Sequence, residues 1–533
     1  MSATAPTTNS TSSTAPTLTV RRRWAALAVL MLPVILIAVD NTVLAFALPG
    51  ISAALSPSGA QLLWIVDAYP LVLAGLLVPM GSLGDSVGRR RLLMVGGLGF
   101  AVVSACAAFA PTAAALIVAR AALGFFGAML MPATLSIIRN VFADPTERRT
   151  AIAVWAAGFS GGAALGPIVG GVLLEHFWWG SVLLLAVPVL IPLLALGLWL
   201  IPESRDPDPS PIDPASIVLV MATMAPIVWA VKDVAYAGVT GASAAAVLVG
   251  LVSGALFVRR QLRRSRPMLD VRLFTVPAFS GALAANLLSV FSLVGFLFFI
   301  SQHLQLVSGR SPLEAGLFLL PGLAVTIVAG LTAVWLVRVF TPAAVVSGGL
   351  LLNAVGYGVI LVSGHAGSDL GLLIAFAILG AGVGMAETIS NDVILSAVPA
   401  HKAGAASAIS ETAYEGGAVL GTAVLGSVLT AAYRSHVEIP GGVPAADAAA
   451  AGETLGGAVE VASTLPAPLG EDLLESARSA FDSGVVVTSS IAAVLMLVAA
   501  VIAGLTLRLR RSRSSQADST GSGVGREANE PTR

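Results

Sequence analysis

The sequence predicts an all-α polytopic membrane protein with fourteen transmembrane helices arranged as six, two and six. Its mean hydropathy is +0.90, 56% of its 533 residues are hydrophobic and only 11% are charged. Such a composition excludes a soluble globular protein. Apolar runs of about 20 residues recur along the chain, as membrane-spanning helices require. They do not alternate with polar residues as the strands of a membrane β-barrel do.

The predicted spans follow one another with short polar connections. In chain order they lie near 24–48, 61–81, 92–110, 113–138, 150–173, 179–201, 214–233, 242–258, 277–301, 313–336, 342–363, 370–397, 404–432 and 485–507. With a cytoplasmic N-terminus, the arginine clusters fall inside, at Arg21–Arg23, Arg89–Arg91, Arg148–Arg149, Arg259–Arg272 and Arg508–Arg513. An error of one span would destroy this asymmetry. The positive-inside rule therefore predicts that both termini are cytoplasmic.

Polar segments divide the spans into two bundles and an extra pair. Residues 1–23 are expected to form a disordered cytoplasmic tail, 24–201 a six-helix bundle, 202–276 a linker with two extra helices near 214–233 and 242–258, 277–508 a second six-helix bundle, and 509–533 a disordered cytoplasmic tail. A weak repeat relates the bundles, because Arg89 and Arg338 each follow a glycine, Gly81 or Gly330, by eight residues. Such paired halves are typical of transporters with a site near the membrane midplane.

The external loop 433–484 is the only long hydrophilic insertion between predicted spans. It carries eight acidic residues against Arg434 and Arg478. Its alanine-rich part and its GEDLLESARSAF segment are each expected to form a short helix. A negatively charged lobe of this kind could attract cations, and a solvated connection without function is the alternative interpretation.

Two charged residues lie deep inside apolar spans. Asp40 interrupts span one, where an ionised carboxylate costs at least ~2.5–3.5 kcal/mol, so it needs a partner, a cavity or a proton pathway. Arg120 lies in the middle of span four and needs an anion or backbone carbonyls. We expect Asp40 and Arg120 to approach within hydrogen-bonding distance and to carry proton coupling. A purely structural buried pair is the alternative.

The segment GSLGDSVGRRR (81–91) forms the short inner loop between spans two and three. Gly81 and Gly88 allow a tight reversal, and Asp85 can pair with a neighbouring arginine or a helix terminus. The whole pattern resembles the loop signature of the major facilitator superfamily. The resemblance implies a gating role for Gly81, Asp85, Gly88, Arg89 and Arg90.

Three further segments match signatures of that family in the same order. VDNTVLAFALP (39–49) is similar to the span-one signature of the fourteen-span drug:proton antiporters, and LIVARAALGFFGA to the span-four signature, with Leu123 in place of the usual glutamine. GFSGGAALGPIVGG in span five is similar to the antiporter signature. Its matching residues are Gly158, Gly162, Gly166, Pro167, Gly170 and Gly171. Taken alone, these glycines are also consistent with ordinary close packing of small residues.

The resemblance implies a major facilitator fold and proton-driven export of drugs by alternating access. The similar proteins are quaternary-ammonium, dye and fluoroquinolone efflux pumps of Gram-positive bacteria and mycobacteria. Their motifs cover spans one to five here, and their topology covers the whole chain. The resemblance extends to WIVDAYPLVLA in span two and SETAYEGGAVLGTAVLG in span thirteen.

Span two carries a candidate site for a cationic substrate. Asp67 lies about six residues into the span from its outer end, and Trp64 shares its helix face. An acid beside an aromatic ring can hold a lipophilic cation. Tyr69 is also assigned to substrate binding, although it lies on another face. The alternative is an acid in a water-filled vestibule. Lys232, beside Asp233 near the outer end of span seven, is expected to be interfacial.

Span thirteen carries two acids on one helix face. Glu411 and Glu415 are four residues apart, and two like charges at mid-membrane cannot both be ionised without cations. In the similar pumps, acids here serve cation recognition and proton coupling; a polar helix face is the alternative. Glu387 and Tyr414 are further substrate-binding candidates. Phe291, Phe296, Phe298 and Phe299 in span nine could line an apolar pocket, with Phe296 assigned to substrate binding, although phenylalanines in spans more often face lipid or pack.

The sequence thus predicts a proton-coupled exporter of lipophilic, mainly cationic compounds in the inner membrane. It contains no GxxxxGK[ST] loop, so no nucleotide is expected, and its single cysteine, Cys106, rules out an intramolecular disulfide. We expect no metal, cofactor or nucleic acid, with drugs, protons and the bilayer as partners of a monomer. The alternatives are a carrier for one dedicated metabolite and a non-transporting membrane sensor. A membrane enzyme is disfavoured because no nucleophile–base set is present.

Overall fold

The structure, a computed structural model, describes residues 19–206, 213–265, 267–363, 369–398 and 403–521. Every regular element within those ranges is a helix. Fourteen of them are long and apolar enough to cross a membrane, which confirms the predicted number of spans.

The spanning helices follow the predicted order. They are α1 (Val20–Leu55), α2 (Gly59–Val87), α3 (Arg89–Ala108), α4 (Ala113–Val141), α5 (Pro145–His176), α6 with α7 (Ser181–Leu184 and Ala186–Leu200), α8 (Pro214–Ala237), α9 (Gly241–Arg263), α10 with the π-helical η2 (Pro277–Gln302 and His303–Val307), α11 (Pro312–Val339), α12 (Pro342–Ser363), α13 (Asp369–Ser396), α14 with the π-helical η5 and α15 (Ala403–Gly421, Thr422–Gly426 and Ser427–His436), and α18 (Ala467–Gly521).

Local sequence signals set several helix starts. Ser58 begins α2 and Ser311 begins α11, each in a capping box in which the serine side chain and a residue three positions on satisfy each other's backbone N–H groups. Asp144 caps α5 by accepting hydrogen bonds from the N–H groups of Thr146 and Glu147. Pro145 occupies the first helical position, where a missing N–H costs nothing.

Two hydrophobic cores divide the molecule into halves. One core lies entirely between Ala26 and Ile201, that is, in α1–α7. The other takes nearly all its members from Ala278 to Leu507. The extra helices α8 and α9 pack on each other, and α8 also contacts α2 and α15. The spans are therefore arranged as six, two and six.

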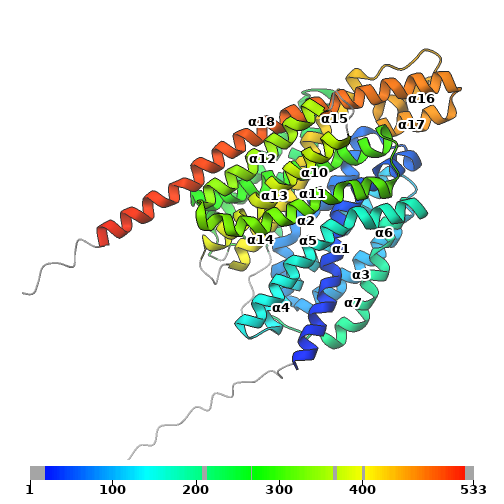
Figure 1. Cartoon of the computed structure of the whole chain (residues 1–533). Helices are drawn as coiled ribbons and strands as arrows, with labels where there is room; N and C mark the ends of the chain where they lie inside the picture. Colours follow the sequence, from blue (N-terminus) through cyan, green and yellow to red (C-terminus); the bar gives the residue numbers. More distant parts are fainter. Residues whose placement is uncertain (1–18, 207–212, 266, 364–368, 399–402, 522–533) are drawn as a thin grey trace, which may run out of the picture.

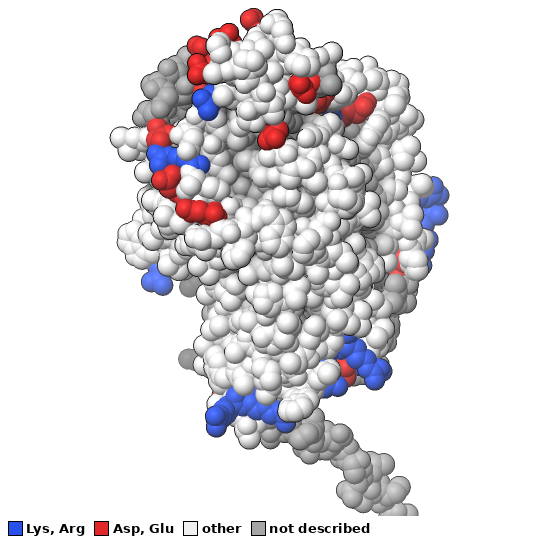
Figure 2. Space-filling view, turned by 90° about the vertical axis from the view of Figure 1, so that its right-hand side faces the viewer, with Lys and Arg blue, Asp and Glu red and all other residues white. Residues whose placement is uncertain are grey.

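The two ends of the bundle differ. Helix α1 begins and α18 ends at one end, hereafter the terminal end, while α16 (Ala445–Glu453) and α17 (Leu455–Thr464) form a lobe at the other, the lobe end (Figure 1). Acidic side chains gather at one end of the molecule in Figure 2, above a broad uncharged face, and basic side chains gather at the bottom of the view. This separation follows the charge asymmetry of the sequence.

Three segment boundaries differ from the sequence expectation. GEDLLESARSAF is not a separate short helix: α18 starts at Ala467 and runs without a break into the last span. The same helix continues to Gly521, beyond residue 509, where a disordered tail is predicted. Helix α1 already begins at Val20, so Arg21–Arg23 are helical. Residues 1–18 and 522–533 lie outside the described residues.

The α8–α9 hairpin is fixed at the terminal end by charge. The Asp213 carboxylate accepts hydrogen bonds from Arg260 Nη2 at 2.8 Å and Nε at 2.9 Å, and it also pairs with Arg264. Hydrogen bonding to Arg260 holds the pKa of Asp213 well below its usual range. Asp213 therefore stays ionised at physiological pH, which keeps this ion pair formed.

Candidate functional site

Asp40 of α1 and Arg120 of α4 form the buried ion pair that the sequence predicts. Arg120 Nη1 lies 2.8 Å from Asp40 Oδ2, and the side chains are 2% and 8% exposed. Arg120 Nε also donates to the carbonyl oxygen of Ile65 in α2 at 3.3 Å. The guanidinium therefore joins three helices of the N-terminal half, and its attachment to α1 depends on a carboxylate that protonation would neutralise.

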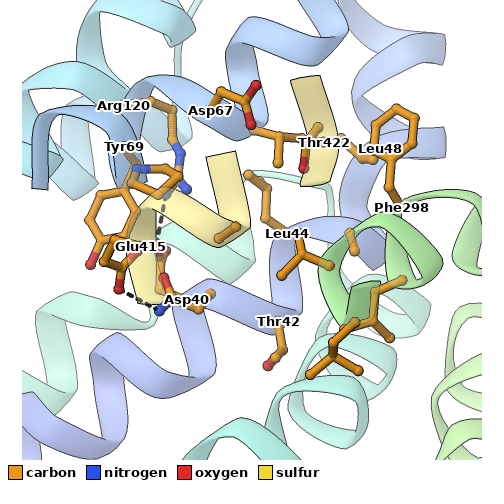
Figure 3. A pocket seen from close by; sticks show the side chains of 18 of the residues that line it. Asp40, Thr42, Leu44, Leu48, Asp67, Tyr69, Arg120, Phe298, Glu415 and Thr422 are labelled. Atoms are coloured by element: carbon orange, nitrogen blue, oxygen red, sulfur yellow. Dashed lines mark hydrogen bonds and ion pairs between the residues drawn. The ribbon is translucent and has the colours of Figure 1, made fainter. Parts of the chain in front are cut away.

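The pair borders a central pocket of about 720 Å³, counting its open mouth, between the two halves (Figure 3). Asp40, Arg120, Tyr69 and Glu415 gather on one side of the pocket, and Leu44, Leu48 and Phe298 line another. An acidic side facing an apolar one suits a lipophilic cation.

Glu415 and Glu411 of α14 face different cavities. Glu415 lines the central pocket, where Asn41 Nδ2 donates to its Oε1 at 3.4 Å. Glu411, one turn away, lines a second cavity of about 1530 Å³, counting its open mouth. Asp85 and Arg139 line the same cavity, which places it towards the terminal end. The two acids thus face different cavities, and that of Glu411 lies nearer the terminal end.

Asp67 has a partner that the sequence does not predict. Lys232 of α8 places its Nζ 2.7 Å from Asp67 Oδ2, with side chains 2% and 0% exposed. The same Nζ lies 4.0 Å from the ring centroid of Trp64. The expectation that Lys232 is interfacial is therefore wrong: α8 packs against α2, and this contact turns Lys232 inward.

The other substrate-binding candidates have different surroundings. Tyr69 is fully buried, and its ring lies 4.6 Å from the Arg120 guanidinium carbon, so it contacts the ion pair. Tyr414 lines the central pocket and packs against Phe159 of α5. Glu387 of α13 lies near Glu411, so the two carboxylates would repel each other if both were ionised.

Phe296 does not line the central pocket. It stacks on Phe376 with ring centroids 4.9 Å apart, inside the core of the C-terminal half. Phe298, two positions along α10, lines the pocket instead. Residues two apart point to different sides of a helix, so the rotation of α10 brings Phe298 to the pocket and places Phe296 in the core.

The α2–α3 turn is held by charges from two segments. Asp85 Oδ1 lies 2.8 Å from Arg89 Nη2. Glu203, in the linker after α7, accepts a hydrogen bond from the backbone N–H of Arg90 at 3.1 Å and lies 3.8 Å from the Arg90 Nε. Gly88 has a φ of 121°, and a Cβ there would lie 2.8 Å from Glu203 Oε1. Glycine is therefore required at this turn. Gly81 lines the terminal-end cavity.

The α5 glycines give close packing on two sides. Cβ atoms on Gly158, Gly162, Gly166 and Gly170 would meet Met31, Ala38, Thr42 and Val43 of α1. A Cβ on Gly171 would lie 2.6 Å from Leu313 Cα of α11, across the boundary between the halves. A Cβ on Gly316 of α11 would in turn meet the carbonyl oxygen of Pro167.

The halves are closed at the lobe end and separated at the terminal end. At the lobe end, α5 meets α11, Gln305 donates to the Phe46 carbonyl oxygen at 3.2 Å, and Glu453 of α16 accepts from the Gly59 N–H at 3.3 Å. At the terminal end, the 1530 Å³ cavity lies between residues of both halves, including Met131 and Ser407. The gap between the halves is therefore open towards the terminal end.

Comparisons with known proteins agree with this architecture. Residues 30–422 match the family described as Major Facilitator Superfamily. The chain is 59% identical to the multidrug efflux pump LfrA of Mycolicibacterium smegmatis, over 92% of this chain and 98% of that protein. It is 38% identical to the methyl viologen resistance protein SmvA of Salmonella typhimurium, over 90% and 97%.

A solved structure shares the fold at low sequence identity. It is a bacterial homologue of the human lysosomal transporter Spinster in an inward-facing and occupied conformation. The TM-score is 0.64 at 18% identity, and the match covers 91% of this chain and 97% of that one.

Proposed function

This chain belongs to the Major Facilitator Superfamily, and from that premise we propose that it is a proton-coupled multidrug efflux antiporter. It is a multi-pass protein of the plasma membrane. It exports lipophilic, mainly cationic compounds such as dyes, quaternary ammonium biocides and fluoroquinolones by alternating access. It works as a monomer and needs no nucleotide, metal or other cofactor, because the proton gradient supplies the driving force.

The observation that carries this proposal is the central pocket between the halves. Its wall holds an acid paired with a guanidinium, Asp40 with Arg120, and a second acid, Glu415, whose Oε2 has no hydrogen-bond partner among the described residues. An ion pair that one proton can break and a free carboxylate oxygen are what exchange of a proton for a cation requires. The names of the two relatives, a multidrug efflux pump and a methyl viologen resistance protein, support the same substrate class.

The geometry supports a sequence of events in which Asp40 changes partner. With the terminal end open and Asp40 ionised on Arg120, a cationic drug enters and is held by the remaining acids, Glu415 among them. The halves then close at the terminal end and open at the lobe end, where a proton binds Asp40 and weakens its ion pair. The drug leaves. Return to the present conformation releases the proton as Arg120 pairs with Asp40 again.

Export of ethidium by energised inverted vesicles tests the proposal. We expect vesicles containing the protein to accumulate ethidium when respiration acidifies their lumen, and to release it when an uncoupler is added. ATP-dependent uptake that survives the uncoupler would contradict proton coupling. Uptake of a single metabolite with no response to any dye or drug would instead favour the dedicated carrier, and the absence of any net transport would favour the sensor.

The orientation gives a separate prediction. In a Cys106→Ser background, a cysteine at Ala445 of α16 should react with an impermeant maleimide added to intact cells, because the lobe end faces outward. A cysteine at Ser2 should react only after permeabilisation, because the terminal end faces the cytoplasm. Labelling of the Ser2 variant in intact cells, or none at Ala445, would reverse the assigned orientation.

A further inference from the structure

The contact between Asp67, Trp64 and Lys232 has the composition of an occupied cation site. A carboxylate lies 2.7 Å from an ammonium, and the ammonium lies over the face of an indole ring at 4.0 Å. These are the two attractions with which a protein holds an organic cation. Here the cation is the protein's own, and it comes from α8, a helix outside the core of either half.

We propose that Lys232 is a built-in competitor for a substrate subsite formed by Asp67 and Trp64. It fills the subsite when no substrate is present, and an organic cation that binds there displaces it. The α8–α9 hairpin is then the element that sets how strongly the pocket binds cations. This inference rests on the proposed function, since it assumes that the central pocket receives cationic substrates.

The site is incompletely satisfied, which makes the lysine replaceable. Lys232 Nζ contacts Asp67 Oδ2 at 2.7 Å, but an ammonium has three protons to donate, and the described residues offer it no second acceptor. Thr422, on the same pocket wall, borders the Asp67 carboxylate. Figure 3 shows Asp67 and Thr422 close to each other at the pocket. Buried polar atoms of this kind are normally paired, and a ligand with a polar group would pair them.

A displaced ammonium would meet hydroxyl groups nearby. Asp67 lines the central pocket, whereas Lys232 lines a narrow cavity whose free space is about 10 Å³, roughly enough for one water molecule. Thr430 and Ser427 border that cavity, and Ser427 Oγ has no hydrogen-bond partner among the described residues. Rotation of the flexible lysine side chain would carry Nζ from Asp67 towards these hydroxyl groups.

Competition of this kind has a measurable consequence. If Lys232 leaves the subsite free only a tenth of the time, the apparent affinity for a cation is reduced about tenfold. Lys232→Met should therefore bind ethidium roughly tenfold more tightly than the parent. Lys232→Arg, which keeps the charge, should stay near the parent. Asp67→Asn combined with Lys232→Met should lose the gain, because the attracting carboxylate is gone. A folded Lys232→Met that binds no more tightly than the parent would overturn the proposal.

A second measurement on the unmodified chain does not depend on a variant that folds. The chain has two lysines, Lys232 and Lys402, so Lys402 serves as an internal control. Reductive methylation of the purified protein, read by mass spectrometry, should modify Lys232 several-fold faster in saturating ethidium while Lys402 changes little. Ethidium that binds without raising the rate at Lys232 would overturn this inference alone. A parent protein that neither binds nor exports ethidium would instead count against the proposed function.

Discussion

Asp40→Asn is expected to abolish accumulation of ethidium against its gradient while leaving ethidium binding intact. Asparagine still accepts a hydrogen bond from Arg120, so the α1–α4 contact in the present conformation is retained. The asparagine side chain cannot take up a proton on one side of the membrane and release it on the other. Transport should therefore become passive, with ethidium moving only down its own gradient.

Energised inverted vesicles distinguish transport of ethidium against its gradient from passive movement down it. Uptake above the equilibrium level should fall to background in Asp40→Asn, and equilibration of preloaded ethidium should persist. Asp472→Asn, which makes the same chemical change at an exposed site in the lobe-end part of α18, is the matched control and should behave as the parent. If Asp40→Asn pumps ethidium as the parent does, Asp40 is not the coupling residue.

Gly171→Ala is expected to weaken closure of the lobe end. The added methyl group would lie 2.6 Å from Leu313 Cα, which belongs to the backbone of α11 and cannot rotate away. Overpacking of this kind costs ~1–3 kcal/mol. It is imposed only when α5 and α11 are in contact, so it disfavours the present conformation relative to one open at the lobe end. Each ~1.4 kcal/mol of this overpacking energy changes the population ratio of the two conformations roughly tenfold.

A cysteine in the pocket wall reports this shift. Ala45→Cys, in the Cys106→Ser background, should react faster with an impermeant maleimide from the lobe side when Gly171→Ala is added, and ethidium export should fall. Gly161→Ala lies on the same helix, has nothing within 4 Å of its added Cβ, and should leave both rates unchanged. Equal rates in the Gly171 and Gly161 variants would show that the α5–α11 contact does not hold the lobe end closed.

The sequence predicts the structure best where every alternative arrangement would bury an unpaired charge or expose an apolar span. Asp40 and Arg120 each interrupt an apolar span at similar depth, and the cost of an unpaired charge there predicts the 2.8 Å contact. The fourteen spans follow from apolar length and the arginine asymmetry in the same way. In each case the physical cost of any other arrangement is large.

The remaining contacts depend on which helices become neighbours, which no local pattern encodes. Lys232 stands beside Asp233 in the sequence, yet its partner is Asp67, because α8 packs against α2. Phe296 and Phe298 are indistinguishable by composition, and only the rotation of α10 decides that Phe298 faces the pocket. The role of Glu203 depends on the linker folding back onto the α2–α3 turn, which no sequence pattern predicts.

The most direct test of proton–drug exchange is proton movement driven by drug alone. Purified protein is reconstituted in liposomes with equal pH on both sides and the membrane potential clamped, and ethidium is added outside. As ethidium flows inward, protons should flow outward, so the lumen should become alkaline, and Asp40→Asn should carry ethidium without that change. Ethidium uptake by the parent with no change in lumenal pH would contradict the antiport mechanism.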